Sequence, residues 1–207
     1  MSLAENIDKL KQGIYALSFY SPLIIVIAVM YWGITVNSGI KSAIYLAMVI
    51  FVSLIRWGCF KYSNKSPNNT TEVLSECSKM IVPEDPTYSV YIISFTLFYL
   101  LVPMILVSNA TNTSLYNFGV ISFFSAFMIY DIIVKSTIHC IDITGASFIF
   151  SLLAGSCLGA GLGSLFYTSA RSFVFINEKQ TDKEVCNMPT KQQFKCRLYK
   201  NGQLVTN

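Results

Sequence analysis

The chain has 207 residues, of which 53% are hydrophobic and only 13% are charged, and its mean hydropathy is +0.52. Soluble domains carry about 25% charged residues, so this composition excludes an ordinary soluble globular protein. The formal net charge of +4 is small and is spread over the loops and the tail, which excludes a concentrated basic surface for nucleic acid. We therefore expect an integral, multi-pass membrane protein whose first partner is the lipid bilayer.

Five uncharged or nearly uncharged stretches are long enough to cross a bilayer core of about 30 Å, which needs about 20 apolar residues of helix. They cover residues 13–35, 42–60, 88–107, 115–134 and 143–168. We expect an all-α transmembrane domain of about five spans over residues 13–170, preceded by a polar head at 1–12 that begins as an interfacial helix. Pro22 lies in the early turns of the first span, where it is expected to bend the helix.

Two charged residues, Arg56 and Asp131, lie inside the spans near their ends, and Lys135 directly follows the fourth span. Arg56 is close enough to the end of the second span for its guanidinium to snorkel to the headgroups. Asp131 and Lys135 lie four residues apart at the end of the fourth span, a spacing that predicts an ion pair on one helical face at the interface. The alternative for Asp131 is a proton or ion relay, because an ionisable residue within a membrane is a functional candidate.

The loop at 61–87 and the link at 136–142 fall on the same side of a five-span protein, and the middle of that loop predicts a short surface helix. Cys77 can pair only with a group on this side. The link contains His139, Cys140 and Asp142, residue types that bind metal ions. A tetrahedral site needs four ligands and the chain has a single histidine, so we predict no metal site and no cofactor.

A ridge of small residues marks the fifth span. Ser151, Gly155, Gly159 and Gly163 recur every four residues and share one helical face. In lipid, small residues let two helix backbones approach closely. The ridge therefore predicts packing against the other spans, self-association into a homo-oligomer, or, third, a pore-lining face.

The tail at 171–207 is a second, small extramembrane unit. Asn201 and Gly202 lie between two apolar segments, a pattern that predicts a β-hairpin with its turn at this pair. Cys186 and Cys196 flank nine residues and are candidates for a disulfide that would stabilise a unit without a core of its own. In a reducing cytosol they would stay thiols or bind metal.

Five spans put the two chain ends on opposite sides of the membrane. Lys and Arg residues of the short loops favour a cytosolic N-terminus by the positive-inside rule. Glycosylation sequons fall on both sides of the third span, so they cannot all be lumenal, and most are expected by chance. They begin at Asn64, Asn68, Asn69, Asn109 and Asn112.

The ending "VCNMPTKQQFKCRLYKNGQLV", residues 185–205, resembles membrane proteins encoded by large DNA viruses of algae and protists, as do the Asn-rich loops and polytopic body. The resemblance implies a virion internal-membrane or host endomembrane protein whose tail docks to capsid or lumenal partners. It carries over no active-site residue.

The spans lack the paired carboxylates, histidine pairs or nucleophile beside a base that an enzyme needs, so we predict no enzymatic activity, and a lipid-modifying enzyme is the weakest alternative. We expect a structural or scaffolding membrane protein whose tail binds a protein partner, since a hairpin edge accepts another strand. The alternative is a small transporter or channel subunit using the fifth span and Asp131. Under the scaffold hypothesis, Gly159→Leu disrupts folding or assembly and Asp131→Asn is nearly silent.

Overall fold

The computed structural model describes residues 3–35, 38–63, 77–111, 117–169, 175, 199–200 and 203–204. The chain divides into two units, 1–176 and 177–207, which are described separately. The described part of the first unit is helical. Its elements are α1 (Leu3–Phe19), α2 (Ser21–Thr35), α3 (Gly39–Ser63), the 3-10 turn η1 (Cys77–Lys79), α4 (Tyr88–Thr111), α5 (Phe118–Thr137) and α6 (Ala146–Ser169).

Four of the described helices, α3 to α6, are long and apolar enough to cross a membrane, and α1 with α2 makes a fifth if the bent pair is one span. This number agrees with the multi-pass arrangement predicted from the sequence. The ends of the helices differ from the predicted spans by a few residues. In α5 the start is fixed by Asn117, whose side chain accepts a hydrogen bond from the backbone N–H of Val120.

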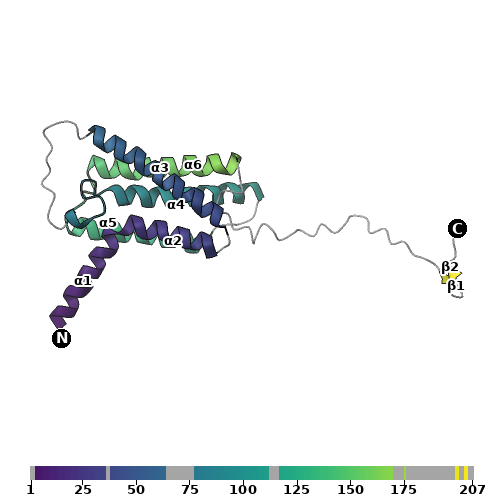
Figure 1. Cartoon of the computed structure of the whole chain (residues 1–207), viewed down its shortest axis with the longest axis horizontal. Coiled ribbons are helices and arrows are strands. Elements are labelled where there is room, and N and C mark those ends of the chain that lie inside the picture. The colour runs from purple at the N-terminus through teal and green to yellow at the C-terminus, as the bar shows by residue number, and fades with distance from the viewer. Residues whose placement is uncertain are drawn as a thin grey trace. The chain divides into compact units, whose positions relative to one another are not determined.

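The first predicted span, 13–35, is wrong as a single helix. The chain breaks at Tyr20, and α1 and α2 meet at an angle of 70° (Figure 1). Pro22 explains the break, because it has no N–H and its ring collides with the carbonyl four residues earlier, that of Ser18. The 15 residues of α2 reach about 22 Å at 1.5 Å per residue, less than the thickness of a bilayer core.

The polar head is part of α1, which is amphipathic. Four exposed apolar side chains line one face of this helix, and the charged side chains of its first three turns occupy the rest. The apolar residues are Ile7, Leu10, Ile14 and Leu17. The hydroxyl of Tyr130 in α5 donates to the carbonyl oxygen of Ile14 at 2.7 Å and so ties α1 to the bundle. This is the pattern of a helix that lies in a membrane interface.

The helix α4 forms the centre of the bundle (Figure 1). In its most apolar segment 72% of the residues are buried, against 22% in α3 and α5 and 28% in α6. Its aromatic side chains Tyr91, Phe95 and Tyr99 are almost completely buried. The outer helices therefore leave most of their apolar surface for lipid, whereas α4 is enclosed by protein.

The small-residue ridge of α6 lies against α4, its most extensive neighbour. A Cβ atom placed on Gly159 would collide with the carbonyl oxygen of Phe95, and one on Gly163 would lie 3.1 Å from the carbonyl oxygen of Tyr99. On Gly155 it would collide with the carbonyl oxygen of Tyr91. The ridge is thus covered by a helix of the same chain. Self-association stays a prediction, and this covered face does not support it.

In the second unit, β1 (Tyr199–Lys200) pairs antiparallel with β2 (Gln203–Leu204), with Tyr199 opposite Leu204. The turn residues Asn201 and Gly202 lie outside the described residues, and so do Cys186 and Cys196. The hairpin as a folded unit and the tail disulfide therefore stay predictions.

Candidate functional site

Four polar residues from three helices form a buried group that we call the Asp131 cluster: Ser18, Ser89, Asp131 and Lys135. Lys135 Nζ lies 3.0 Å from Asp131 Oδ1, within one helix. Ser18 of α1 donates to Asp131 Oδ1 at 2.8 Å, and Ser89 of α4 donates to Asp131 Oδ2 at 2.6 Å. Lys135 Nζ also donates to Ser89 Oγ. Each charge is thus neutralised and hydrogen-bonded.

The Asp131 pair is buried between helices rather than placed at the interface, since Asp131 is 0% exposed and Lys135 is 2% exposed. The four-residue spacing of Asp131 and Lys135 was predicted from the sequence, but the burial of the pair was not. Removing the carboxylate charge would leave the Lys135 ammonium without a counter-charge, which is costly in a buried site. The expectation that Asp131→Asn is nearly silent therefore does not follow from this geometry.

A second buried group, the Arg56 cluster, consists of Arg56, Asp85, Thr87 and Ser151. Arg56 Nε donates to Asp85 Oδ2 at 2.7 Å and Arg56 Nη2 donates to Asp85 Oδ1 at 3.0 Å, which makes a bidentate pair. Arg56 Nη2 also donates to Thr87 Oγ1 at 2.9 Å, and Ser151 Oγ of α6 donates to the same oxygen at 2.9 Å. The cluster joins α3, the segment before α4, and α6.

The prediction that Arg56 snorkels to the headgroups is wrong. The side chain is 7% exposed and turns inward, because the nearby Asp85 supplies a carboxylate that the fold brings to the end of α3. The guanidinium carbon also lies 5.5 Å from the centroid of the Tyr91 ring, within range of a cation–π contact.

Both carboxylates lie at the N-terminal end of α4. Asp85 precedes the first residue of that helix by three positions, and Asp131 accepts from Ser89 in its first turn. The exposed N–H groups of a helix start carry a partial positive charge that favours anions. Both carboxylates therefore lie where the dipole of α4 complements their charge.

The two clusters are separated by a space of about 10 Å³, lined among others by Phe19, Asp85, Ser89 and Lys135. A single water molecule needs about 10–15 Å³. This part of the bundle is therefore filled by side chains and leaves no room for a hydrated ion.

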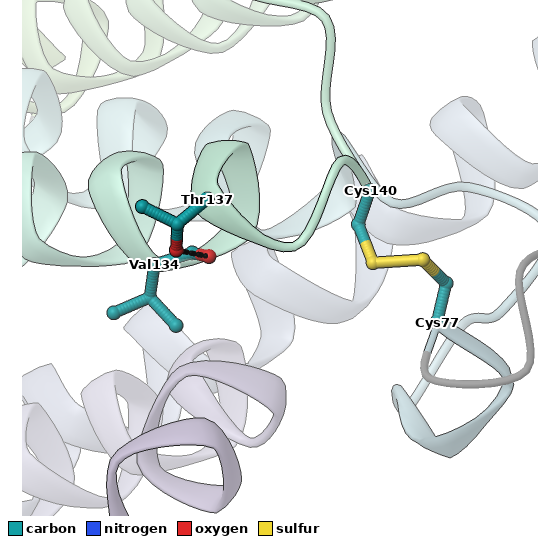
Figure 2. Close-up of a disulfide and its surroundings, with 4 residues drawn as sticks. All are labelled: Cys77, Val134, Thr137 and Cys140. Atoms are coloured by element: carbon teal, nitrogen blue, oxygen red, sulfur yellow. Dashed lines mark hydrogen bonds between the residues drawn. A yellow bond between two sulfur atoms is a disulfide. The ribbon is translucent and has the colours of Figure 1, made fainter. Parts of the chain in front are cut away.

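A disulfide between Cys77 and Cys140 connects the segments that carry the two clusters (Figure 2). Cys77 lies eight residues before Asp85, and Cys140 lies five residues after Lys135. The two Cα atoms are 5.8 Å apart, and Cys77 packs with Phe19 and Met80. The bond requires that the loop before α4 and the link after α5 lie on one side of the membrane, as the predicted topology has them.

The turn after α5 directs Cys140 toward Cys77. His139 has a φ of 55°, its backbone N–H donates to the carbonyl of Ser136, and that of Cys140 donates to the carbonyl of Lys135. This is the Schellman ending of a helix, with a left-handed residue after the cap. Because Cys140 is consumed in the disulfide, it is not a metal ligand, and the described residues contain no group of three or more potential ligands.

Asp142, the acidic residue of this link, is exposed. Its Oδ1 accepts from the hydroxyl of Thr144 at 2.7 Å and from the backbone N–H of Thr144 at 3.0 Å. These hydrogen bonds lower the pKa of the Asp142 carboxyl below its ordinary value. Asp142 therefore caps the start of the link to α6 and takes no part in either cluster.

Sequence reasoning missed Asp85, Ser18 and Ser89 as partners of the intramembrane charges. A usable signal was present for Asp85, because "PEDP" lies on the same side of the membrane as the end of the second span that carries Arg56. The pairing of Cys77 with Cys140 could also have been considered, since the predicted topology put both on one side. Nothing in the sequence marks Ser18 or Ser89 among the many serines.

The chain was compared with family models, with curated proteins and with solved structures, and none of them matches.

Proposed function

We propose that the chain is a structural or scaffolding protein of a membrane, a multi-pass anchor whose C-terminal unit binds a protein partner. The observation that carries this proposal is the closed state of the two clusters, where every charge has a partner and about 10 Å³ remains between them. A solute pathway needs polar groups free to exchange ligands and space for the solute. Saturated charges in a filled site instead favour a role in holding helices together.

The alternative of a small transporter or channel subunit rests on Asp131 as an intramembrane carboxylate and on α6. Two features favour the scaffold over it. The carboxylate is already shared by three donors, and the small-residue face of α6 is covered by α4 rather than open to a pore.

Reconstitution tests this choice. The full chain in liposomes should show no ion or proton flux above that of empty liposomes under an imposed gradient. A flux that disappears in the doubly neutral variant Asp131→Asn/Lys135→Met, with the protein still folded, would show that the transporter reading is right. The double change is preferable to Asp131→Asn alone because it does not strand the buried ammonium.

Affinity purification from the source membrane tests the partner. The full chain should co-purify with a defined protein, and a chain ending at Ile176, the boundary of the first unit, should lose it. Equal recovery of that protein with both chains would remove the role of the tail. A capsid protein among the partners would support the viral internal membrane that the C-terminal resemblance suggests.

The disulfide supports a particular orientation. Disulfides persist in oxidising compartments and are rare in a reducing cytosol, so Cys77–Cys140 favours a lumen, a periplasm or the exterior for the side that carries it. The N-terminus lies on that same side when the bent pair α1–α2 crosses the membrane as one span. This is the reverse of the orientation that the Lys and Arg distribution predicts. The tail would then be cytosolic, where Cys186 and Cys196 stay thiols.

Synthesis into microsomes tests the orientation. If the N-terminal side is lumenal, the sequons of the 61–87 loop become glycosylated and Asn68→Gln/Asn69→Gln abolishes or reduces the shift in mass. Modification at Asn109 or Asn112 instead would establish the cytosolic N-terminus. Thiol labelling of Cys77 and Cys140 without reductant should fail in the first case and succeed in the second.

A further inference from the structure

A groove of about 740 Å³ follows the outer face of α3 beside the segment 82–88. Its wall is mainly apolar and includes Val49, Leu54, Trp57 and Phe60. From Val49 to Lys61 the helix rises about 18 Å at 1.5 Å per residue, which is close to one leaflet of a bilayer core about 30 Å thick. The groove thus has the length of a single acyl chain, with one apolar and one polar end.

The polar end carries a cation, Lys61, and an anion, Glu84, neither of which is in an ion pair with another of the described residues. Lys61 Nζ lies 4.9 Å from the centroid of the Trp57 ring, and Glu84 is exposed on the opposite segment. Neither residue has an ion pair or a side-chain hydrogen bond within the described part of the chain. Arg56 and Asp85 border the same end, but they are committed to each other.

Charge complementarity selects among membrane lipids. An anionic headgroup would be attracted by Lys61 and repelled by Glu84, so it gains little from this end of the groove. A zwitterionic headgroup places its phosphate near Lys61 and its ammonium near Glu84 and satisfies both. A primary ammonium donates hydrogen bonds to a carboxylate, whereas a quaternary ammonium has no N–H and donates none.

We propose that this groove is a binding site for an ethanolamine phospholipid. One acyl chain lies along the apolar wall of α3, the phosphate contacts Lys61, and the ammonium donates to Glu84. The exposed Trp57 lies at the level of the headgroup, where aromatic side chains collect in membrane proteins. The site is independent of the tail and of the scaffold role.

Native mass spectrometry of the full chain in detergent tests the proposal. The probes are phosphatidylethanolamine, phosphatidylcholine and phosphatidylglycerol with identical acyl chains at equal concentration. The wild type should retain the ethanolamine lipid preferentially. Glu84→Gln should lower the ethanolamine-to-choline ratio by about two- to fivefold, the size of one exposed ion pair, and Lys61→Gln should weaken binding of both zwitterionic lipids.

Matched controls make the same changes of charge away from the groove. Glu5→Gln and Lys9→Gln on α1 should leave the lipid ratio unchanged, while Leu54→Trp should reduce retention of all three lipids by filling the apolar wall. A thermal melt confirms that each variant is folded. Preference for the glycerol lipid, equal retention of ethanolamine and choline lipids, an unchanged ratio in Glu84→Gln, or an equal change in Glu5→Gln would each overturn the proposal.

Discussion

The two buried clusters contain the same kinds of charge but are built in different ways. Asp131 and Lys135 lie four residues apart in α5, so the helix itself brings the charges together. Arg56 and Asp85 are 29 residues apart and meet only because α3 and the segment before α4 pack side by side. The first pair is a property of one helix that the fold then buries, whereas the second pair is a joint between helices.

The difference predicts how each cluster responds to damage. In the Asp131 cluster, the links to α1 and α4 are single hydroxyl groups, and the loss of one leaves the ion pair in place. In the Arg56 cluster, the bidentate ion pair is itself the link between α3 and the segment before α4, so its loss leaves a buried charge without its partner. We therefore expect the Arg56 cluster to be the more sensitive of the two.

The largest effect is expected from Asp85→Ala. It leaves the Arg56 guanidinium buried without a partner, which typically costs about 3–5 kcal/mol. Reversible unfolding in mixed micelles should show that loss in the free energy of unfolding, and Arg56→Met added to Asp85→Ala should recover a large part of it. A double variant no more stable than Asp85→Ala would contradict the account of the pair as a joint.

Removing the disulfide tests whether the two clusters depend on the same covalent link. Cys77→Ser/Cys140→Ser should lower the free energy of unfolding by about 2–4 kcal/mol, and the wild type in reductant should behave alike. Because the bond connects the segments of Asp85 and Lys135, hydrogen exchange should rise together at the end of α5, in the Asp131 cluster, and at the end of α3, in the Arg56 cluster. Increased exchange at only one of them would show that the clusters are held independently.

The contact between α4 and α6 along the glycine ridge lies outside the two clusters. Changes there test the effect of packing without a change of charge. Gly159→Ala should destabilise by about 1–3 kcal/mol, the usual cost of overpacking, because the added Cβ meets the carbonyl oxygen of Phe95. Gly161→Ala is the matched control, since no atom of the described residues lies within 4 Å of its Cβ position, and it should be neutral or gain up to about 1 kcal/mol of helix propensity. Equal effects of the two would indicate that the ridge does not determine the packing.

A smaller effect is expected for Ser18→Ala, which removes one hydroxyl link of the Asp131 cluster. Lys135 and Ser89 still contact the carboxylate, so the loss should be about 1 kcal/mol, as for a single hydrogen bond. Ser164→Ala is the control, because among the described residues that hydroxyl bonds only a backbone carbonyl of its own helix, that of Gly161. A loss as large as that of Asp85→Ala would refute the predicted ranking of the clusters.

The smallest effect concerns Asp142, which lies outside both clusters. Its pKa is lowered in the folded chain by the hydrogen bonds from Thr144, so the stability that it adds is present above its unfolded pKa of about 3.9. That contribution disappears as the pH falls through the lower folded value. Melting curves between pH 6 and 3, taken as about the range of that titration, should show a slightly weaker acid dependence for Asp142→Asn than for wild type.

The sequence by itself determined that this protein is built from several long apolar helices suited to a membrane, four of them or five if the bent pair α1–α2 is one span. Long uncharged stretches have no stable alternative in lipid to the helix, because every backbone group must be satisfied within the segment. The i,i+4 spacing of Asp131 and Lys135 and the four-residue repeat from Ser151 to Gly163 were equally visible, since both are periodicities of one helix.

Only the tertiary structure decided which residues and helices these features contact. The partner of Arg56 comes from a distant segment, so no local pattern predicts that the side chain turns inward to Asp85. The same holds for the partner helix of the glycines and for Cys77 with Cys140, whose choice among several partners depends on how the helices are ordered around α4. A helix fixes its own face through local hydrogen bonds, whereas the neighbour of that face is selected by the packing of the whole bundle.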